Sequence, residues 1–97
     1  EFMGNMNFID LGDGELVAVR PENLALRPAG SGQKQGRIST VMVLGHFLEI
    51  NVEAEGAYLK AFMPRESGAQ YKVGDAVGVE IGRHRRFPRE QAPAAGA

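Results

Sequence analysis

The chain has 97 residues, no cysteine, a 43% apolar fraction and a net charge of −1. This length suits one domain with a single apolar core, and the composition lies outside the disordered range. The lack of cysteine excludes disulfides, thiolate metal sites and thiol nucleophiles. No apolar run approaches the roughly 18–20 residues needed to span a bilayer.

The first residues read as an addition to a natural sequence. Glu1-Phe2 stands ahead of Met3, as expected of a cloning remnant, so we assign residues 1–4 to a remnant and linker. The domain itself is expected to occupy residues 5–82. We therefore expect the chain to be a piece of a longer protein.

Two short strands and a loop are predicted in the first third of the chain. Leu16–Val19 is an apolar, β-compatible run that follows a glycine-rich turn and ends at Arg20-Pro21, because proline donates no ladder hydrogen bond. Leu24–Leu26 reads as a second strand. Pro28–Gly36 contains Gly, Ser, Gln and Lys with nothing to bury, which predicts a flexible loop.

The middle of the chain carries the strongest strand signals. Ile38–Leu44 is rich in β-branched residues, and residues 48–54 alternate strictly between apolar and polar, which predicts one buried and one wet face. Glu55-Gly56 then turns the chain into Tyr58–Met63, the expected antiparallel partner in a hairpin. Pro64 ends that strand.

The last third is expected to contain one more strand and then a tail. A Val-Gly-Asp turn at residues 73–75 leads into Val77–Ile81, which we predict to be the final strand, and a single helical turn near Pro64–Gln70 is compatible with the sequence. Residues 1–82 hold 7 basic and 11 acidic side chains, a net charge of −4, whereas residues 83–97 hold 4 basic and 1 acidic, a net charge of +3. We expect residues 83–97 to form a basic, disordered tail.

These elements predict an all-β protein without a long helix. Unpaired edges are costly in a small sheet, and curling the sheet into a barrel shortens or removes them. The sequence therefore favours a small OB-like or SH3-like barrel of five to six strands.

The sequence offers no catalytic or metal site. His46 and His84 are the only histidines and stand in no ligand cluster. Gly30–Gly36 lacks the Gly-Lys step of a phosphate-binding loop, so we expect no ATP hydrolysis and no cofactor in this chain. No carboxylate pair, Ser/His/Asp set or activated lysine is apparent, and we expect no enzymatic activity.

The basic segment Arg83–Phe87 leaves open a nucleic-acid or anionic-lipid contact. An OB-type barrel with aromatic side chains on its open face would stack bases. The acidic body argues against binding to a phosphate backbone, and we expect no nucleic-acid partner.

Short phrases in a fixed order carry the most specific information. None contains a plausible catalytic group. In chain order they are Gly4–Ile9, Arg20-Pro21-Glu22, the pair Leu24 and Leu26, Val43-Leu44-Gly45, and Lys72–Val77.

These phrases, over about residues 4–82, resemble the transport-associated OB (TOBE) domain found C-terminal to the ATPase domain of many ABC importers. The resemblance implies a non-catalytic accessory or regulatory domain of an ATP-binding subunit, cytoplasmic and held near the inner membrane by the transporter. Implied partners are a second copy, the ATPase domain of the same chain and, indirectly, the permease. ATP and Mg²⁺ would bind to the parent ATPase domain.

The resemblance and the residue types give two sets of candidate site residues. Arg20, Glu22 and the loop Gly45-His46-Phe47 are expected at an interface between domains or subunits. The alternative function is a module for a small oxyanion such as molybdate, or for another effector. Its candidate residues are Ser39, Thr40, Lys60 and Arg65.

Overall fold

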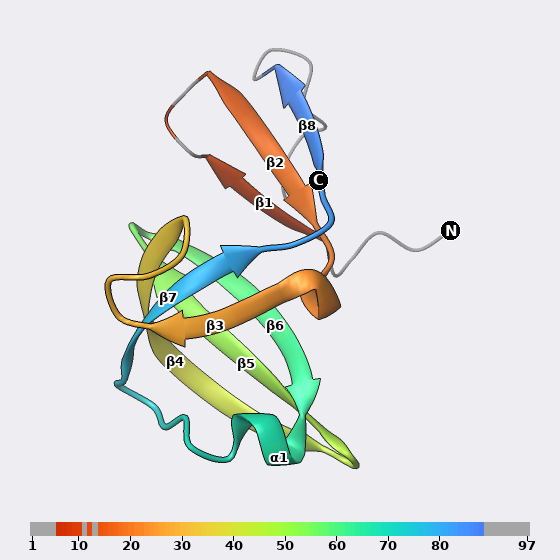
Figure 1. Cartoon of the computed structure of the whole chain (residues 1–97), viewed down its shortest axis with the longest axis vertical. Coiled ribbons are helices and arrows are strands. Elements are labelled where there is room, and N and C mark those ends of the chain that lie inside the picture. The colour runs from red at the N-terminus through yellow and green to blue at the C-terminus, as the bar shows by residue number, and fades with distance from the viewer. Residues whose placement is uncertain (1–5, 11, 13, 89–97) are drawn as a thin grey trace.

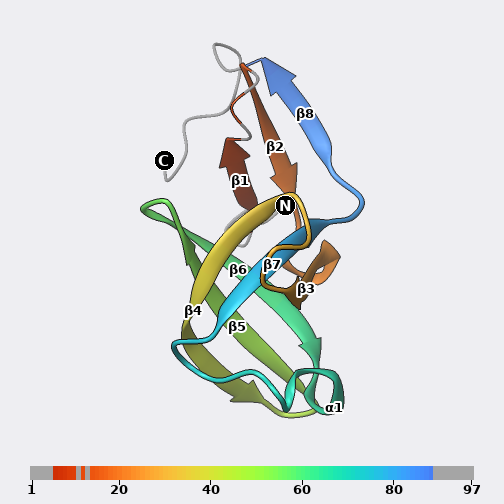
Figure 2. The same cartoon turned by 60° about the vertical axis from the view of Figure 1, so that its left-hand side comes forward.

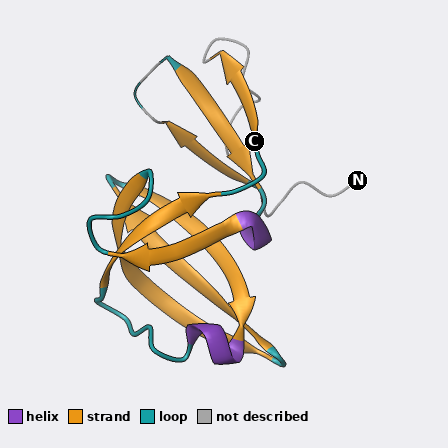
Figure 3. Cartoon of the chain, viewed as in Figure 1, coloured by secondary structure: helices purple, strands orange, loops and turns teal. Residues whose placement is uncertain are grey.

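The computed structural model describes residues 6–10, 12 and 14–88 and shows an all-β protein with two antiparallel sheets (Figures 1 and 3). A short 3₁₀ helix, η1 (Pro21–Asn23), and a single helical turn, α1 (Arg65–Gly68), are the described helices. The strands are β1 (Asn7–Asp10), β2 (Glu15–Val19), β3 (Leu24–Pro28), β4 (Lys34–Leu44), β5 (Phe47–Ala54), β6 (Ala57–Pro64), β7 (Ala76–Ile81) and β8 (Arg85–Pro88).

The large sheet contains five strands in the order β3-β7-β4-β5-β6. Strand β4 bends through it, because residues 34–37 pair with β7 while residues 37–44 pair with β5. A bulge between Ile38 and Thr40 accompanies the bend, as an extra residue on one strand increases local twist. The result is the strongly curled sheet of Figure 1.

The small sheet has the order β1-β2-β8 and lies at one end of the large sheet in both views (Figures 1 and 2). The chain enters the large sheet from β2 through η1 and returns from β7 into β8. The small sheet is thus made from both ends of the described chain.

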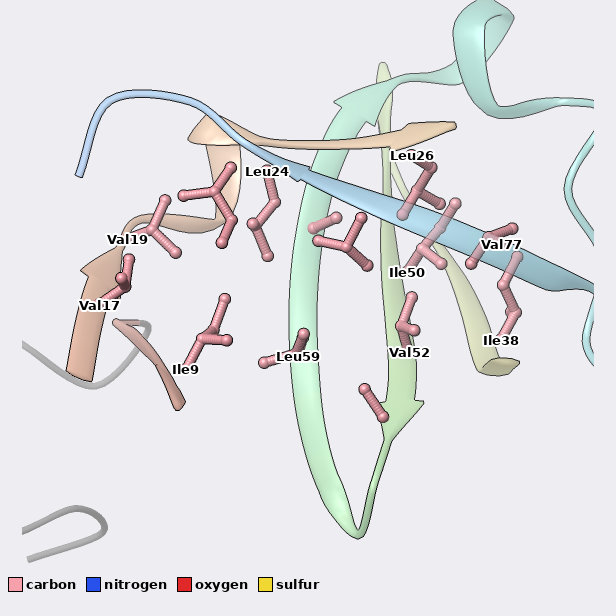
Figure 4. Packing of buried hydrophobic residues seen from close by; sticks show 14 of the residues in the cluster. Ile9, Val17, Val19, Leu24, Leu26, Ile38, Ile50, Val52, Leu59 and Val77 are labelled. Atoms are coloured by element: carbon pink, nitrogen blue, oxygen red, sulfur yellow. The ribbon is translucent and has the colours of Figure 1, made fainter. Parts of the chain in front are cut away.

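One apolar core joins the two sheets (Figure 4). Ile9, Val17 and Val19 extend from the small sheet into a cluster with β5, β6 and β7 side chains, and Val17 is 0% exposed. The predicted alternation in β5 is confirmed, since Leu48, Ile50, Val52 and Ala54 are all buried.

A buried amide side chain also joins the sheets. Asn7 is 6% exposed; its Nδ2 donates to the carbonyl oxygen of Lys60 at 2.8 Å, and its Oδ1 accepts from the Lys60 N–H at 2.8 Å. The side chain therefore takes the place of a pairing strand at one residue of the edge strand β6.

The all-β class is confirmed, but the expected barrel of five to six strands differs from the structure. The described chain has eight strands, and no hydrogen-bonded ladder among the described residues joins β3 to β6, although these edge strands contact each other. The large sheet is therefore a curled OB-like sheet that strand pairing does not close.

The expectation of a disordered tail from residue 83 is wrong for Arg85–Pro88, which form β8 and pair with β2. The remainder of that tail, and residues 1–5 of the expected remnant and domain start, lie outside the described residues.

The predicted flexible loop at 28–36 also needs correction. Strand β3 continues to Pro28 and β4 begins at Lys34, so the connection is only five residues long. Two glutamine amides hold it: Gln33 Oε1 accepts from the Ile81 N–H at 2.9 Å, and Gln35 bridges Gly30 and Ser31. These amides satisfy backbone groups of the connection and of β7.

Candidate functional site

The outward face of the β4-β5-β6 sheet becomes apolar towards the β4–β5 turn. Strand register places Leu44, Phe47 and Pro64 in one cross-strand row and Met42, Glu49 and Phe62 in the next. Met42 is 49% and Phe47 42% exposed, and the ring centroids of Phe47 and Phe62 lie 5.7 Å apart. We call Met42, Phe47, Phe62 and Pro64 of this face the apolar end surface, together with the neighbouring Met63, which pairs with Leu48 and packs partly against the core.

Part of this surface is hollowed. An open depression of about 340 Å³ is lined by Phe47, Phe62, Met63 and Pro64, with Glu22 at its side. Glu22 reaches this position because Pro21 starts η1 and the Leu24 N–H closes it by donating to the Pro21 carbonyl. Such a depression suits an apolar side chain of a partner.

The fold brings together two of the five predicted interface residues. Glu22 and Phe47 are 25 positions apart in sequence but line the same depression. Gly45 forms the adjacent turn with a φ of 64°, a conformation that favours glycine. His46 is exposed and its carbonyl accepts from the Arg65 N–H at 3.0 Å, whereas Arg20 is exposed just before η1 and does not line the depression.

Four residues of the apolar end surface were missed by sequence reasoning: Met42, Phe62, Met63 and Pro64. A signal existed for one of them. In β6, Leu59 and Ala61 are buried, so alternation places Phe62 with Lys60 on the wet face of the hairpin. An aromatic residue on a wet face indicates a contact surface.

The four predicted effector-binding residues do not all lie together. Thr40, Asn51 and Lys60 share one cross-strand row, in which Asn51 Nδ2 donates to Thr40 Oγ1 at 2.7 Å. Ser39 Oγ donates to the Asn51 carbonyl at 3.2 Å, and Lys60 Nζ lies 3.7 Å from Glu49 Oε2. The fourth candidate, Arg65, stands at the start of α1, next to the β4–β5 turn.

A second, larger hollow of about 650 Å³ lies between β1, the start of β4 and the β5–β6 turn. Lys34 crosses it, with Nζ 2.8 Å from Glu55 Oε1 and 3.1 Å from the Asp10 carbonyl oxygen. The ammonium group is therefore occupied by two acceptors of the chain itself and holds the small sheet against the hairpin tip.

The described residues contain no group of three or more His, Cys, Asp or Glu that could hold a metal ion. None of the described helices is long and apolar enough to cross a membrane. Within the same residues, every buried side-chain nitrogen and oxygen has a hydrogen-bond partner, so no orphaned polar atom marks a cofactor site.

Comparisons with known proteins agree with this geometry. A family model described as "TOBE domain" matches residues 17–87, and so includes the first three residues of β8. A molybdate-bound crystal form of the cytoplasmic molybdate-binding protein ModG has a similar fold, with a TM-score of 0.64 and 15% identity over 74% of this chain. This chain spans 60% of the length of that ModG chain. No curated protein sequence matches.

Proposed function

Because the chain belongs to the TOBE domain family, we propose that it is a non-catalytic accessory domain of the ATP-binding subunit of an ABC importer. In that setting it supports dimerisation of the subunit and regulation of solute uptake. ATP and Mg²⁺ bind to the ATPase domain of the parent chain. The domain lies in the cytoplasm, and the permease holds the assembly at the inner membrane.

The apolar end surface is the observation that supports a contact role. Isolated apolar side chains are common on protein surfaces, but a cluster with aromatic members and a hollow centre is typical of an interaction site. Glu22 contributes a negative charge at the side of the depression, which favours a partner with a basic group nearby.

A standing contact between accessory domains has a direct mechanical consequence. Two ATPase domains that are tethered through their accessory domains meet at a high effective concentration, so their closure around nucleotide becomes an intramolecular step. A regulator that binds the accessory domains better in one arrangement than in the other shifts that closure.

The test uses the full-length parent subunit. We expect Phe47→Asp to weaken subunit dimerisation and to reduce nucleotide-driven closure, because it places a charge in the apolar depression. Tyr58→Asp is the matched control, since Tyr58 is 66% exposed on the same hairpin but outside the surface. Sedimentation and ATP hydrolysis measure the two effects. Unchanged dimerisation, hydrolysis and uptake after removal of the whole domain would refute the proposal.

A second candidate function is binding of a small oxyanion. Two observations favour it: the fold similarity to molybdate-binding ModG, and the row of hydroxyl, amide and ammonium groups at Thr40, Asn51 and Lys60. The nearby Glu49 carboxylate opposes an anion at Lys60.

Calorimetry with molybdate, tungstate, sulfate and phosphate tests the oxyanion candidate. We expect heat of binding with at least one of these anions and its loss in Lys60→Met. Lys72→Met serves as the control, because Lys72 lies outside the row. Absence of heat with all four anions would remove the candidate.

A further inference from the structure

Strand register divides the small sheet into two faces. Directly opposed residues in neighbouring antiparallel strands point to the same side. The inner face carries Ile9, Val17 and Val19, which join the core. The outer face carries two cross-strand rows, Phe8–Ala18–Arg85 and Asp10–Leu16–Phe87.

Four of the six residues of the outer face are apolar, including both residues of its central strand. Ala18 is only 5% exposed although it does not belong to the core cluster, and Phe8, Leu16 and Phe87 are half-buried. Outside its own strands, the small sheet meets β6 through Ile9 and Asn7 of the inner face. At one edge, Phe8 and Asp10 of the outer face line the hollow that Lys34 crosses. A sheet that is apolar on both faces is typical of one that is covered on both sides.

The two charged residues of the outer face stand at opposite corners. Asp10 lies on β1 in one row and Arg85 lies on β8 in the other row, and both are exposed. Asp10 Oδ1 also accepts from the Gly12 N–H at 2.9 Å. A second copy can be related to the first by a two-fold axis that runs parallel to the sheet surface and perpendicular to the line between Asp10 and Arg85. This rotation places Asp10 of each copy opposite Arg85 of the other. Phe8 and Phe87 occupy the other two corners and fall near that axis, each facing its own copy.

We propose that the outer face of the small sheet binds the same face of a second copy of this chain, with two reciprocal Asp10–Arg85 ion pairs. With about 4.8 Å between strands and about 3.4 Å per residue along a strand, the strands of the two sheets cross at roughly 70°. This is close to the orthogonal class of sheet packing. The same surface patch serves both copies, as a two-fold interface requires.

The size of the face sets the strength of the contact. Six side chains per copy are far fewer than the roughly 20–30 residues of a standard stable interface. The dimer is therefore weak and concentration-dependent, with a dissociation constant on the order of 10⁻⁴ M. The inference concerns this chain alone and does not depend on the transporter setting.

Sedimentation of the 97-residue chain up to about 1 mM tests the proposal. We expect Asp10→Arg and Arg85→Asp, each alone, to weaken association by about tenfold, because each replaces two attractive pairs with two repulsive ones. The chain that carries both substitutions regains association. An equimolar mixture of the two single variants also regains it, since each mixed dimer contains two attractive pairs.

The control reverses the charges of another arginine–carboxylate ion pair, one that lies within a single chain and away from the small sheet. Arg27→Glu with Glu80→Arg reverses the Arg27–Glu80 pair on the large sheet and leaves association unchanged. Circular dichroism establishes that each variant is folded. A monomer at 1 mM overturns the proposal, and so does a dimer that ignores both single substitutions. A dimer that is instead lost in Phe47→Asp assigns the contact to the apolar end surface and equally overturns it.

Discussion

At the scale of single residues, Asn7 is the side chain with the clearest structural task. It makes two hydrogen bonds to the backbone of Lys60 from a buried position. Asn7→Ala leaves a buried N–H and carbonyl without partners, so we expect a loss of about 2 kcal/mol in the free energy of unfolding. Urea unfolding measures the loss, and amide exchange at Lys60 accelerates in parallel.

Asn51→Ala is the matched control for this change. Asn51 also donates through its side-chain amide, but to the exposed Thr40 hydroxyl, so its loss is expected to cost less than about 0.5 kcal/mol. Equal costs for the two variants would mean that the Asn7 hydrogen bonds contribute no more than a surface contact.

Gly78 is required for close packing of the backbone. A Cβ built at Gly78 would collide with the Ser31 carbonyl oxygen and lie 2.8 Å from the Ser31 carbonyl carbon. We expect Gly78→Ala to destabilise the protein by about 3 kcal/mol or more, because backbone atoms must move. Thermal unfolding compares it with Gly74→Ala, where only the φ of 96° opposes alanine and about 1 kcal/mol is expected. A cost for Gly78→Ala no larger than for Gly74→Ala would contradict the close approach.

At the scale of elements, β8 is expected to contribute to stability although it is short and basic. A chain ending at Gly82 loses four cross-strand pairs with β2, among them Leu16–Phe87, whereas a chain ending at Pro88 keeps them. We expect the shorter chain to be less stable by about 1–2 kcal/mol. Urea midpoints of the two truncated chains measure this difference. Coincident midpoints would show that β8 pairing adds nothing.

The sequence predicted the strands whose own residues alternate or cluster as apolar runs. Residues 48–54, 58–63 and 77–81 belong to this class, and the structure places each in a strand. Strands β1 and β8 escaped prediction because their pairing depends on β2, a partner remote from β8 in sequence. Arg85-Arg86-Phe87-Pro88 contains no alternation that a local pattern could reveal.

The candidate contact surface was predictable only in part for a related reason. Glu22 and Phe47 were both candidate interface residues, but their meeting depends on how η1 packs beside β6. Phe62 and Met63 belong to no recognisable phrase and acquire their position from the register between β5 and β6. Sequence patterns therefore identified Phe47 at the end of the sheet but not the other residues of the apolar end surface.

At the scale of the whole molecule, the two sheets are expected to unfold together. Val17 lies in the small sheet, is fully buried and belongs to a core cluster that includes Val79 of the large sheet. A shared core couples the stability of its parts, and small single domains usually unfold in one transition. Val17→Ala removes two methyl groups without polar consequences, so we expect a loss of about 2 kcal/mol.

The decisive measurement follows unfolding in each sheet separately. Amide resonances of Ala18 and Val79 report on the small and the large sheet, and urea titrations of both variants give a midpoint for each resonance. We expect the two midpoints to coincide in the original chain and to fall together in Val17→Ala. If only the Ala18 midpoint falls, the small sheet is an independently melting unit, and the core contacts of Ile9, Val17 and Val19 do not make the two sheets one cooperative domain.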